Sequence, residues 1–596
     1  RPLHRIGVVG VGGDVPEPCS KELFYRDPFG AVPCGTSVTL RCVFAEASAA
    51  PVLSVRYEAG TEREHFSLEP ASVTRTEDGM LAEYHLEGTR LQRYGVYFYS
   101  FSLCGEEAGE EHQITVYEKD LSVPEWFLET VIYQIFPDRY YKAEDPNVQN
   151  KKNSFLYGCW DDLPIYLRKD DGTIERWEFY GGNLKGIAEK LPYVEALGCT
   201  AIYLNPIFEA ESNHRYDTAD YKKVDGLLGG EEAFDLLLWE AKSRGIRIVL
   251  DGVFNHTGKN SKYFKARESE YKDWYTFRDD GTYDCWWGVG DLPAVNKSSK
   301  SYLDFIADGP DSVVRCWSRK GISGWRLDVA DELPDSMIRK IRAAAEAERP
   351  DSVLIGEVWE DASNKISYGE RKTYFTAREL HTHTNYVFRS TLLSFLEGSL
   401  SAKDAASVFE TIRENYPVHN YYAQINMTGS HDVERLMTVM LRITKDDRRL
   451  ARDLVKAFSL IQFTIPGVPL IYYGDETCLE GERDPDNRRT YPWNAQDREM
   501  IEWFAGLSLL RKDSRTLVKG DAAFFSEEDG NVFALLRCPC EPGGKYYLTV
   551  CDRFGRGTDF LQKAAGRIAE GIEKIRKKRY IISKEAGGYA ITAEFL

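Results

Sequence analysis

The sequence predicts an α/β fold, a (β/α)8 TIM barrel flanked by a β domain on each side. From Trp126 onward, short apolar strands alternate with amphipathic helical stretches rich in Lys and Glu. Strands that alternate with helices form parallel sheets, and eight such strands are the number that closes a barrel. The eight predicted strands are residues 131–136, 201–204, 247–251, 324–328, 353–357, 384–387, 424–427 and 468–473. We therefore expect a closed barrel over residues 123–510.

The interval between the third and fourth predicted strands is too long for one loop and one helix. Residues 257–305 within it are rich in Tyr, Trp, Gly and Asp. We expect them to form a small subdomain inserted after strand 3.

The two ends of the chain carry strand patterns without alternating helices. In residues 1–122, apolar or alternating segments such as 37–44 and 95–101 are separated by Gly and Pro, which predicts an N-terminal β-sandwich. Residues 511–596 return to strand patterning, and we expect an antiparallel C-terminal β domain there. A helical stretch near residues 560–578 interrupts that pattern.

The bulk composition excludes some classes of partner. The chain has 76 Lys and Arg against 94 Asp and Glu, a net charge of −18, which argues against nucleic acid and anionic membranes. No apolar run has the length of a transmembrane helix. Of the 12 cysteines only Cys538 and Cys540 lie close together, a poor zinc signature and far from a disulfide scaffold. We expect thiols in a reducing compartment, and hence a cytoplasmic protein.

Four acidic residues lie at or shortly after the ends of predicted strands: Asp251, Asp328, Glu357 and Asp432. In a barrel these ends converge on one face, where catalysis occurs. Glycoside hydrolysis uses such a cluster, in which one carboxylic acid protonates the leaving oxygen and a carboxylate attacks or activates water. Crowding also raises the pKa of one member of such a cluster. A single Asp or Glu at a strand end often only caps the next helix, but four together favour a catalytic site.

The neighbours of these carboxylates carry a family resemblance. The segments are DGVFNH at 251–256, GWRLDVA at 324–330, GEVW at 356–359 and SHD at 430–432. In this order they resemble the four signature regions of the α-amylase family, glycoside hydrolase family 13, over roughly residues 126–510. The resemblance implies that Asp328 is the nucleophile and Glu357 the general acid/base. It implies that Asp432 is a third carboxylate, which holds the sugar hydroxyls at the transition state.

The same resemblance assigns residues that bind the sugar. Arg326, two residues before the nucleophile, points to the same side of its strand and can keep Asp328 ionised and aimed. His256 and His431 are expected to hydrogen-bond the sugar in the −1 subsite, and Asp251 to organise the site.

Trp359 follows the predicted acid/base by two positions. It could offer the acceptor sugar an aromatic platform, which would favour transfer to sugar over water. The alternative is that Trp359 only packs at the barrel rim.

Further segments resemble one group within the family, the neopullulanases, cyclomaltodextrinases, maltogenic amylases and amylopullulanases. Residues 212–221 (SNHRYDTADY) match that group, which implies that Tyr216 stacks on the −1 sugar. Residues 484–488 (DPDNR) are similar to its D-P-x-x-R element, which implies that Asp484 and Arg488 bind sugar on the non-reducing side. A surface ion pair is the alternative for these two residues.

The N-terminal segment at residues 25–33 (YRDPFGAVP) looks like the family 34 carbohydrate-binding module that precedes the barrel in this group. Because that module can pair with a second chain and narrow the active-site cleft, the resemblance implies a homodimer through the N-terminal domain.

The chain departs from the group's pattern in three places. The usual V-A-N-E is VADE at 329–332, and the usual M-P-K-L-N is LPAVN at 292–296. In the calcium-binding loop after the first strand, Lys142 and Asn183 stand where Asn and Asp are expected. No cofactor is expected to be required, and calcium has only a few candidate oxygen ligands left. They are Asp145, Asn147 and Asn150.

These observations predict a retaining α-glucan hydrolase that cleaves α-1,4 bonds in cyclodextrins, pullulan, maltodextrins or starch. Some α-1,6 cleavage or transglycosylation is compatible with the same site. A glucanotransferase acting mainly by transfer is the nearest alternative, because it shares the covalent intermediate. A non-catalytic carbohydrate-binding or transporter-associated barrel is disfavoured, because the three catalytic-type carboxylates are present and no anchor segment is seen.

Overall fold

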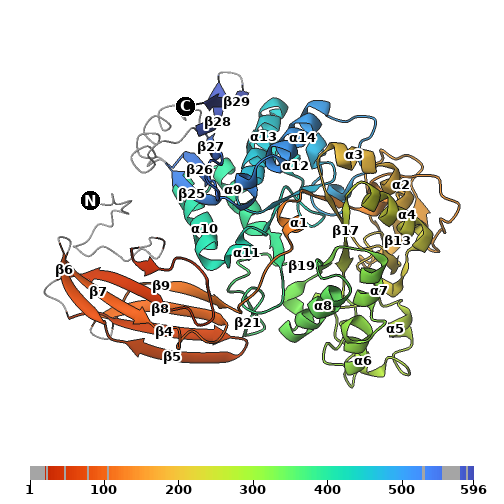
Figure 1. The fold of residues 1–596 in the computed structure, drawn as a ribbon. Coiled ribbons are helices and arrows are strands. Elements are labelled where there is room, and N and C mark those ends of the chain that lie inside the picture. The colour runs from red at the N-terminus through yellow and green to blue at the C-terminus, as the bar shows by residue number, and fades with distance from the viewer. Residues whose placement is uncertain are drawn as a thin grey trace. The chain divides into compact units, whose positions relative to one another are not determined.

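The computed structural model describes Lys21 and residues 24–45, 49–76, 79–103, 106–526, 530–553, 577–585 and 588–595 (Figure 1). The chain divides into two compact units. The N-terminal unit comprises Arg1–Leu121, Ser363–Ala377 and Arg413–Pro417, and the barrel unit comprises Ser122–Ala362, Arg378–Ile412 and Val418–Leu596.

The N-terminal unit contains two β-sheets, as expected. One has the strand order β1-β3-β7-β6 and the other β2-β9-β8-β4-β5. Alternating burial in β3 follows the two-residue period of a strand with one face on a core. The core between the sheets includes Leu40, Val55, Tyr84 and Tyr97. The strands are β1 Arg26–Asp27, β2 Val32–Pro33, β3 Val38–Phe44, β4 Val52–Ala59, β5 Glu62–Leu68, β6 Ser72–Thr76, β7 Gly79–Leu86, β8 Gly95–Leu103 and β9 Glu106–Tyr117.

Two segments from later in the sequence complete this unit. The first carries the short strands β20 (Ile366–Ser367) and β21 (Glu370–Arg371). Its Arg371 forms a buried ion pair with Glu58 at 2.7 Å. The second segment supplies Glu414, which pairs with the buried Arg26 at 2.7 Å. The structure therefore builds the N-terminal unit from three stretches of chain.

The barrel unit contains a closed eight-stranded barrel in the predicted order. The strands are β10 Ile132–Ile135, β14 Ala201–Leu204, β17 Arg247–Gly252, β18 Gly324–Leu327, β19 Val353–Gly356, β22 Thr382–Asn385, β23 Ile425–Met427 and β24 Val468–Tyr472. Neighbours pair in parallel, and β24 closes the ring on β10 through Tyr133 and Ile471. The predicted barrel is confirmed.

Helices cover the outside of the barrel (Figure 1). In α8 the residues at 337, 338, 341, 344 and 345 are buried, the spacing of a helix with one apolar face. The longer covering helices are α4 Gly230–Ser243, α7 Val313–Lys320, α8 Asp335–Glu348, α9 Tyr386–Glu397, α10 Ala402–Asn415, α12 Leu436–Ile443, α13 Arg448–Thr464 and α14 Arg498–Lys512. The shorter helices of the barrel unit include α1 Glu125–Leu128, α2 Leu184–Glu189, α3 Leu191–Ala196, α11 Val418–Tyr421 and α15 Arg515–Lys519.

Two segments are inserted between consecutive strands of the barrel. Residues 257–305 form an aromatic-rich subdomain with the helices α5 (Lys262–Lys265) and α6 (Lys300–Leu303), in which Tyr263 stacks on Trp274 at 5.2 Å. A second insertion, not anticipated from the sequence, lies between β10 and β14. It is a three-stranded sheet of β11 (Ser154–Leu156), β13 (Ile174–Phe179) and β12 (Leu167–Arg168).

The C-terminal sheet has five strands in sequence order: β25 Asp521–Ser526, β26 Val532–Cys538, β27 Tyr546–Asp552, β28 Lys577–Glu585 and β29 Gly588–Phe595. The expectation of a purely antiparallel sheet is wrong for one pair, because β27 and β28 run parallel. Parallel neighbours require a crossover connection, which a strand pattern alone does not reveal. The predicted helical stretch near 560–578 lies outside the described residues up to 576, and 577 and 578 begin β28.

Within the part of the chain that the structure describes, no helix combines the length and the apolar character needed to cross a lipid bilayer.

Candidate active site

The centre of the site is Arg326 on β18, which contacts three carboxylates. Its Nη1 lies 3.0 Å from Asp251 Oδ1 and 2.8 Å from Asp328 Oδ1, and its Nη2 lies 3.1 Å from Glu357 Oε2. The geometry follows from strand register. Asp251 pairs directly with Arg326 across β17 and β18, while Asp328 and Glu357 each follow the last residue of their strand. All four side chains are buried.

The single positive charge of Arg326 faces three carboxyl groups, so ionisation of all three at once is unfavourable. Burial raises the pKa of Asp328 well above its ordinary value, and the charges of Glu357, Asp251 and Asp432 raise it further, while Arg326 opposes them. Burial likewise raises the pKa of Asp251 against the effect of Arg326. Like charges close together in a low-dielectric site titrate as one set. The cluster is therefore suited to hold an ionised and a protonated carboxyl group side by side.

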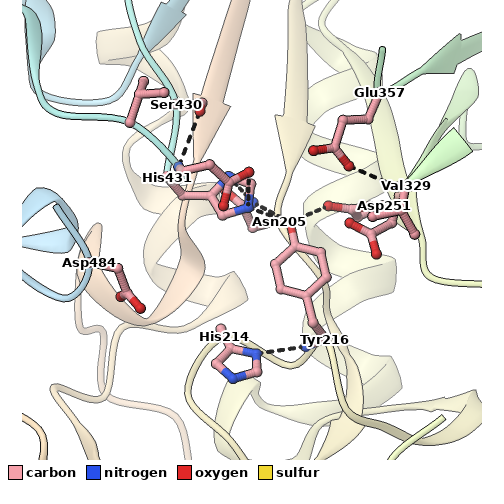
Figure 2. Close-up of polar contacts among 12 residues, drawn as sticks. Asn205, His214, Tyr216, Asp251, Val329, Glu357, Ser430, His431 and Asp484 are labelled. Carbon is pink, nitrogen blue, oxygen red and sulfur yellow. Dashed lines mark hydrogen bonds and ion pairs between the residues drawn. The ribbon is translucent and has the colours of Figure 1, made fainter. Parts of the chain in front are cut away.

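Val329 holds Glu357 through the backbone. Its N–H donates a hydrogen bond of 2.8 Å to Glu357 Oε2 (Figure 2). The indole N–H of Trp359 donates one of 3.0 Å to Glu357 Oε1. Val329 adopts φ 42° and ψ 56°, the left-handed region that a β-branched residue rarely occupies. Such a conformation costs on the order of 1–3 kcal/mol and is found at functional sites. The strained backbone of Val329 therefore points its N–H at Glu357, and this hydrogen bond orients the carboxyl group toward the cluster.

The hydroxyl group of Tyr216 joins the Arg326 cluster to His431. It hydrogen-bonds Asp251 Oδ2 at 2.8 Å and His431 Nε2 at 2.7 Å, and it accepts from Asn205 Nδ2 at 3.0 Å (Figure 2). The rings of Tyr216 and His431 are nearly parallel, with an interplanar angle of 9°. Three polar partners fix the ring of Tyr216.

His431 is a neutral hydrogen-bond donor. Its Nδ1 lies 3.1 Å from the side-chain amide nitrogens of both Gln134 and Asn205, so Nδ1 accepts and Nε2 carries the proton. Burial lowers the pKa of His431 well below its ordinary value. The Nε2–H group can donate a hydrogen bond to the Tyr216 hydroxyl or to Asp432 Oδ2, which lies 3.2 Å away.

Two further histidines hold the main chain of Tyr216. His256 Nε2 lies 3.2 Å from the carbonyl oxygen of Tyr216, and the amide N–H of Tyr216 donates to His214 Nδ1 at 3.0 Å. Burial lowers the pKa of both histidines to about 3. The structure thus places His256 against protein main chain, and its expected contact with the sugar stays a prediction.

A second arginine cluster, centred on Arg488, lies beside the first. Arg488 Nη1 pairs with Asp484 Oδ1 at 2.8 Å, Nη2 lies 3.8 Å from Asp432 Oδ1, and Nε donates to the carbonyl oxygen of His431 at 3.1 Å. The side chains of Asp432 and Asp484 remain 30% and 40% exposed. In Figure 2, Asp484 lies on the side of His431 away from Asp251 and Glu357.

Comparison with known proteins decides the family. Residues 134–519 match the alpha amylase catalytic domain. The chain belongs to the α-amylase family. Amylopullulanase of Thermoanaerobacter thermohydrosulfuricus is 32% identical over 89% of this chain and 40% of its own length. Neopullulanase 2 of Thermoactinomyces vulgaris is 32% identical over 75% of this chain and 74% of its own. A solved cyclomaltodextrinase structure superposes with a TM-score of 0.64 at 25% identity, covering 90% of this chain and 91% of its own.

This α-amylase family chain spans less than half the length of the amylopullulanase it matches. The expected resemblance to the amylopullulanase, neopullulanase and cyclomaltodextrinase group is confirmed.

Trp359 combines the two environments considered for it. Its ring stacks on Tyr386 with a centroid distance of 3.7 Å and an angle of 2°, yet the side chain is 43% exposed. Tyr386 in turn hydrogen-bonds Ser430 Oγ at 2.9 Å. The indole is therefore a rigid, partly exposed aromatic surface beside Glu357.

The candidate calcium ligands contact neighbouring protein groups or lie exposed at the surface. Asn147 Nδ2 donates to Glu232 at 2.9 Å, and the Asn147 N–H donates to Asp145 Oδ1. Asn150 is exposed. Asn183 caps α2 through Oδ1 and donates from Nδ2 to the carbonyl oxygen of Ala143 at 2.8 Å. Among the described residues no group of three or more His, Cys, Asp or Glu side chains is placed to hold a metal ion.

Several residues of the site were missed from the sequence. Gln134 and Asn205 orient His431, Tyr203 donates to Asp251 Oδ2 at 2.6 Å, and Val329 acts through its backbone. A polar residue in or just after an apolar barrel strand is a usable signal for Gln134 and Asn205. No sequence signal marks the conformation of Val329.

Proposed function

We propose that this chain hydrolyses α-1,4-glucosidic bonds of α-glucans with net retention of configuration. The observation that carries the proposal is the contact of one buried guanidinium group with Asp251, Asp328 and Glu357 at 3.0, 2.8 and 3.1 Å. Two carboxyl groups at one sugar carbon suffice for double displacement.

In the proposed reaction, Asp328 attacks the anomeric carbon while Glu357 gives its proton to the leaving glycosidic oxygen. A glycosyl ester forms on Asp328. Glu357, now ionised, takes a proton from water as the water oxygen attacks the anomeric carbon, and the ester bond breaks. Arg326 keeps Asp328 aimed and stabilises its charge when it leaves. The chemistry uses side chains alone, and calcium has no step in it.

The −1 sugar is proposed to lie against Tyr216, with His431 and Asp432 at its hydroxyl groups. The neutral Nε2–H donor of His431 and the half-exposed carboxylate of Asp432 offer one donor and one acceptor to a pair of hydroxyls. Asp484 and Arg488 are proposed to bind the sugar on the non-reducing side of the scissile bond.

The proposed substrates are cyclodextrins, pullulan, maltodextrins and starch, because the relatives are named amylopullulanase, neopullulanase and cyclomaltodextrinase. Parallel assays on α-cyclodextrin, pullulan and soluble starch, with product lengths measured, rank these polymers. Panose from pullulan would indicate α-1,4 cleavage, and maltotriose would indicate α-1,6 cleavage.

A glucanotransferase is the second candidate, favoured by the partly exposed indole of Trp359 beside Glu357. An acceptor sugar bound on this surface would compete with water for the glycosyl ester. Counting reducing ends separates the two, since hydrolysis creates one per bond broken and pure transfer conserves their number.

A homodimer through the N-terminal unit and a cytoplasmic location complete the proposal. Ten described cysteines form no disulfide bond with one another, which suits a reducing compartment. Sedimentation of the wild-type chain, and of a chain with a charge reversal on the exposed face of β5, tests the dimer.

The catalytic assignment is tested with Asp328→Asn and Glu357→Gln. Each variant should lose at least about 10³-fold in kcat, because each removes a group that reacts. Circular dichroism checks the fold. Near-normal kcat in either folded variant would refute the assignment.

A further inference from the structure

We propose that Tyr166 is a specificity-determining residue, which positions Asp484 and forms the wall of the cleft on the non-reducing side. The proposal rests on the hydrolase function proposed above. Tyr166 belongs to the inserted sheet of β11, β12 and β13, where it immediately precedes β12.

The first observation is the contact between Tyr166 and Asp484. The Tyr166 hydroxyl donates to Asp484 Oδ1 at 2.7 Å, and the same oxygen receives Arg488 Nη1 at 2.8 Å. Two donors on one oxygen fix the rotamer of the carboxylate. Within the described part of the chain no hydrogen bond reaches Asp484 Oδ2, so that oxygen is available to accept from a sugar hydroxyl.

The second observation is a row of aromatic rings that ends at Tyr166. Tyr166 meets Trp177 edge to face at a centroid distance of 5.8 Å, and Trp177 meets His214 at 5.1 Å. His214 in turn accepts the amide N–H of Tyr216. The row therefore links the residue proposed to lie against the −1 sugar to the carboxylate proposed to bind the next sugar.

The third observation is that this arrangement comes from the insertion and not from the barrel. Trp177 lies on β13 and Tyr166 beside β12, and these two strands pair antiparallel. The barrel supplies Asp484 and Arg488 from the loop after β24. A chain lacking the inserted sheet would keep the ion pair and lose the hydrogen bond from Tyr166. In this proposal the insertion limits how many sugar units lie beyond the −1 position.

The test compares Tyr166→Phe and Tyr166→Ala with the wild type on maltohexaose labelled at its reducing end. Tyr166→Phe removes only the hydroxyl group, so KM should rise about threefold to tenfold while kcat stays within about twofold. Tyr166→Ala also removes the ring, and the labelled products should become shorter as longer non-reducing fragments are accommodated.

Ile165→Ala is the matched control, because Ile165 is the exposed neighbour of Tyr166 on the same segment. It should keep wild-type KM and product lengths. Wild-type values in both Tyr166 variants would overturn the proposal, as would equal changes in Ile165→Ala. A wild-type chain that cleaves no α-glucan would instead overturn the proposed function, and the role of Tyr166 with it.

Discussion

The two arginine clusters of the site differ in charge balance and in exposure. Arg326 has three carboxylate partners, and its own side chain and those of its partners are at most 10% exposed. Arg488 has two carboxylate neighbours, whose side chains are 30% and 40% exposed. In the first cluster water cannot screen the charges, whereas in the second it can.

This difference separates chemistry from binding. A buried excess of carboxylates favours proton sharing, which general acid catalysis needs. The carboxylates of the Arg488 cluster are partly exposed, so they can exchange water for sugar hydroxyls. We therefore expect substitutions in the Arg326 cluster to change kcat and those in the Arg488 cluster to change KM.

The largest effect is expected for Arg326→Met. Removing the cation leaves three buried carboxylates uncompensated, which should cost about 3–5 kcal/mol of stability and lower kcat by about 10³-fold or more. Thermal unfolding and steady-state kinetics on maltohexaose measure both. The kinetic loss should grow as the pH rises and more carboxylates ionise. A variant that keeps wild-type kcat would contradict the role assigned to this arginine.

Arg488→Met is the counterpart in the exposed cluster and should have a smaller effect. KM for maltohexaose should rise about tenfold with kcat reduced less than about fivefold, because the lost ion pair positions Asp484 and Asp432 without joining the reaction. The melting temperature should fall by only about 1–3 °C. If kcat falls as far as in Arg326→Met, the two clusters do not divide chemistry from binding.

The smallest effect concerns Glu178, a buried residue of β13 whose pKa is affected by Asp484. Burial raises its pKa from 4.5 to about 7, and Asp138 and Asp484 add to the shift while Arg139 opposes it. Between pH 4.5 and about pH 7, Glu178 keeps its proton in the folded chain and releases it in the unfolded chain. The stability contributed by Glu178 is therefore complete below pH 4.5 and is lost as the pH rises through 7.

Glu178→Gln removes this titration and keeps the shape of the side chain. The difference in melting temperature, variant minus wild type, should be about 2–4 °C higher at pH 8 than at pH 5. Melting curves at both pH values measure the difference. An equal shift at pH 5 and pH 8 would show that Glu178 is ionised in the folded chain throughout.

The sequence predicted the parts of the fold that depend on periodicity. All eight barrel strands were found, most of them because they are short apolar runs with a helical stretch after them. The exception is β22, whose sequence is polar and which the predicted strand at 384–387 overlaps only at its last two residues. The sheet of β11, β12 and β13 was missed, since its strands are short and partly exposed. The parallel pair β27 and β28 was also missed, because direction depends on a connection and not on strand pattern.

At the site, the sequence located residues that project from strand ends but not those that act through geometry. Asp251, Arg326, Asp328 and Glu357 were foreseen, and the structure brings them together. The contact between Tyr166 and Asp484 joins positions 318 residues apart, which no local pattern encodes. The imidazole of His256 contacts the Tyr216 carbonyl oxygen, a contact that no local pattern predicts, and its expected contact with the sugar stays a prediction.

The left-handed backbone of Val329 has a consequence for protein engineering. Glycine adopts a positive φ without steric cost, so Val329→Gly is an obvious candidate for a stabilising substitution. Here the strained peptide group carries the N–H that holds Glu357. A glycine would relieve the strain, but it would also give the backbone more conformational freedom, so the N–H would be held less firmly toward Glu357. Designs that aim to raise the stability of this chain should therefore keep Val329 as an active-site residue and change other positions.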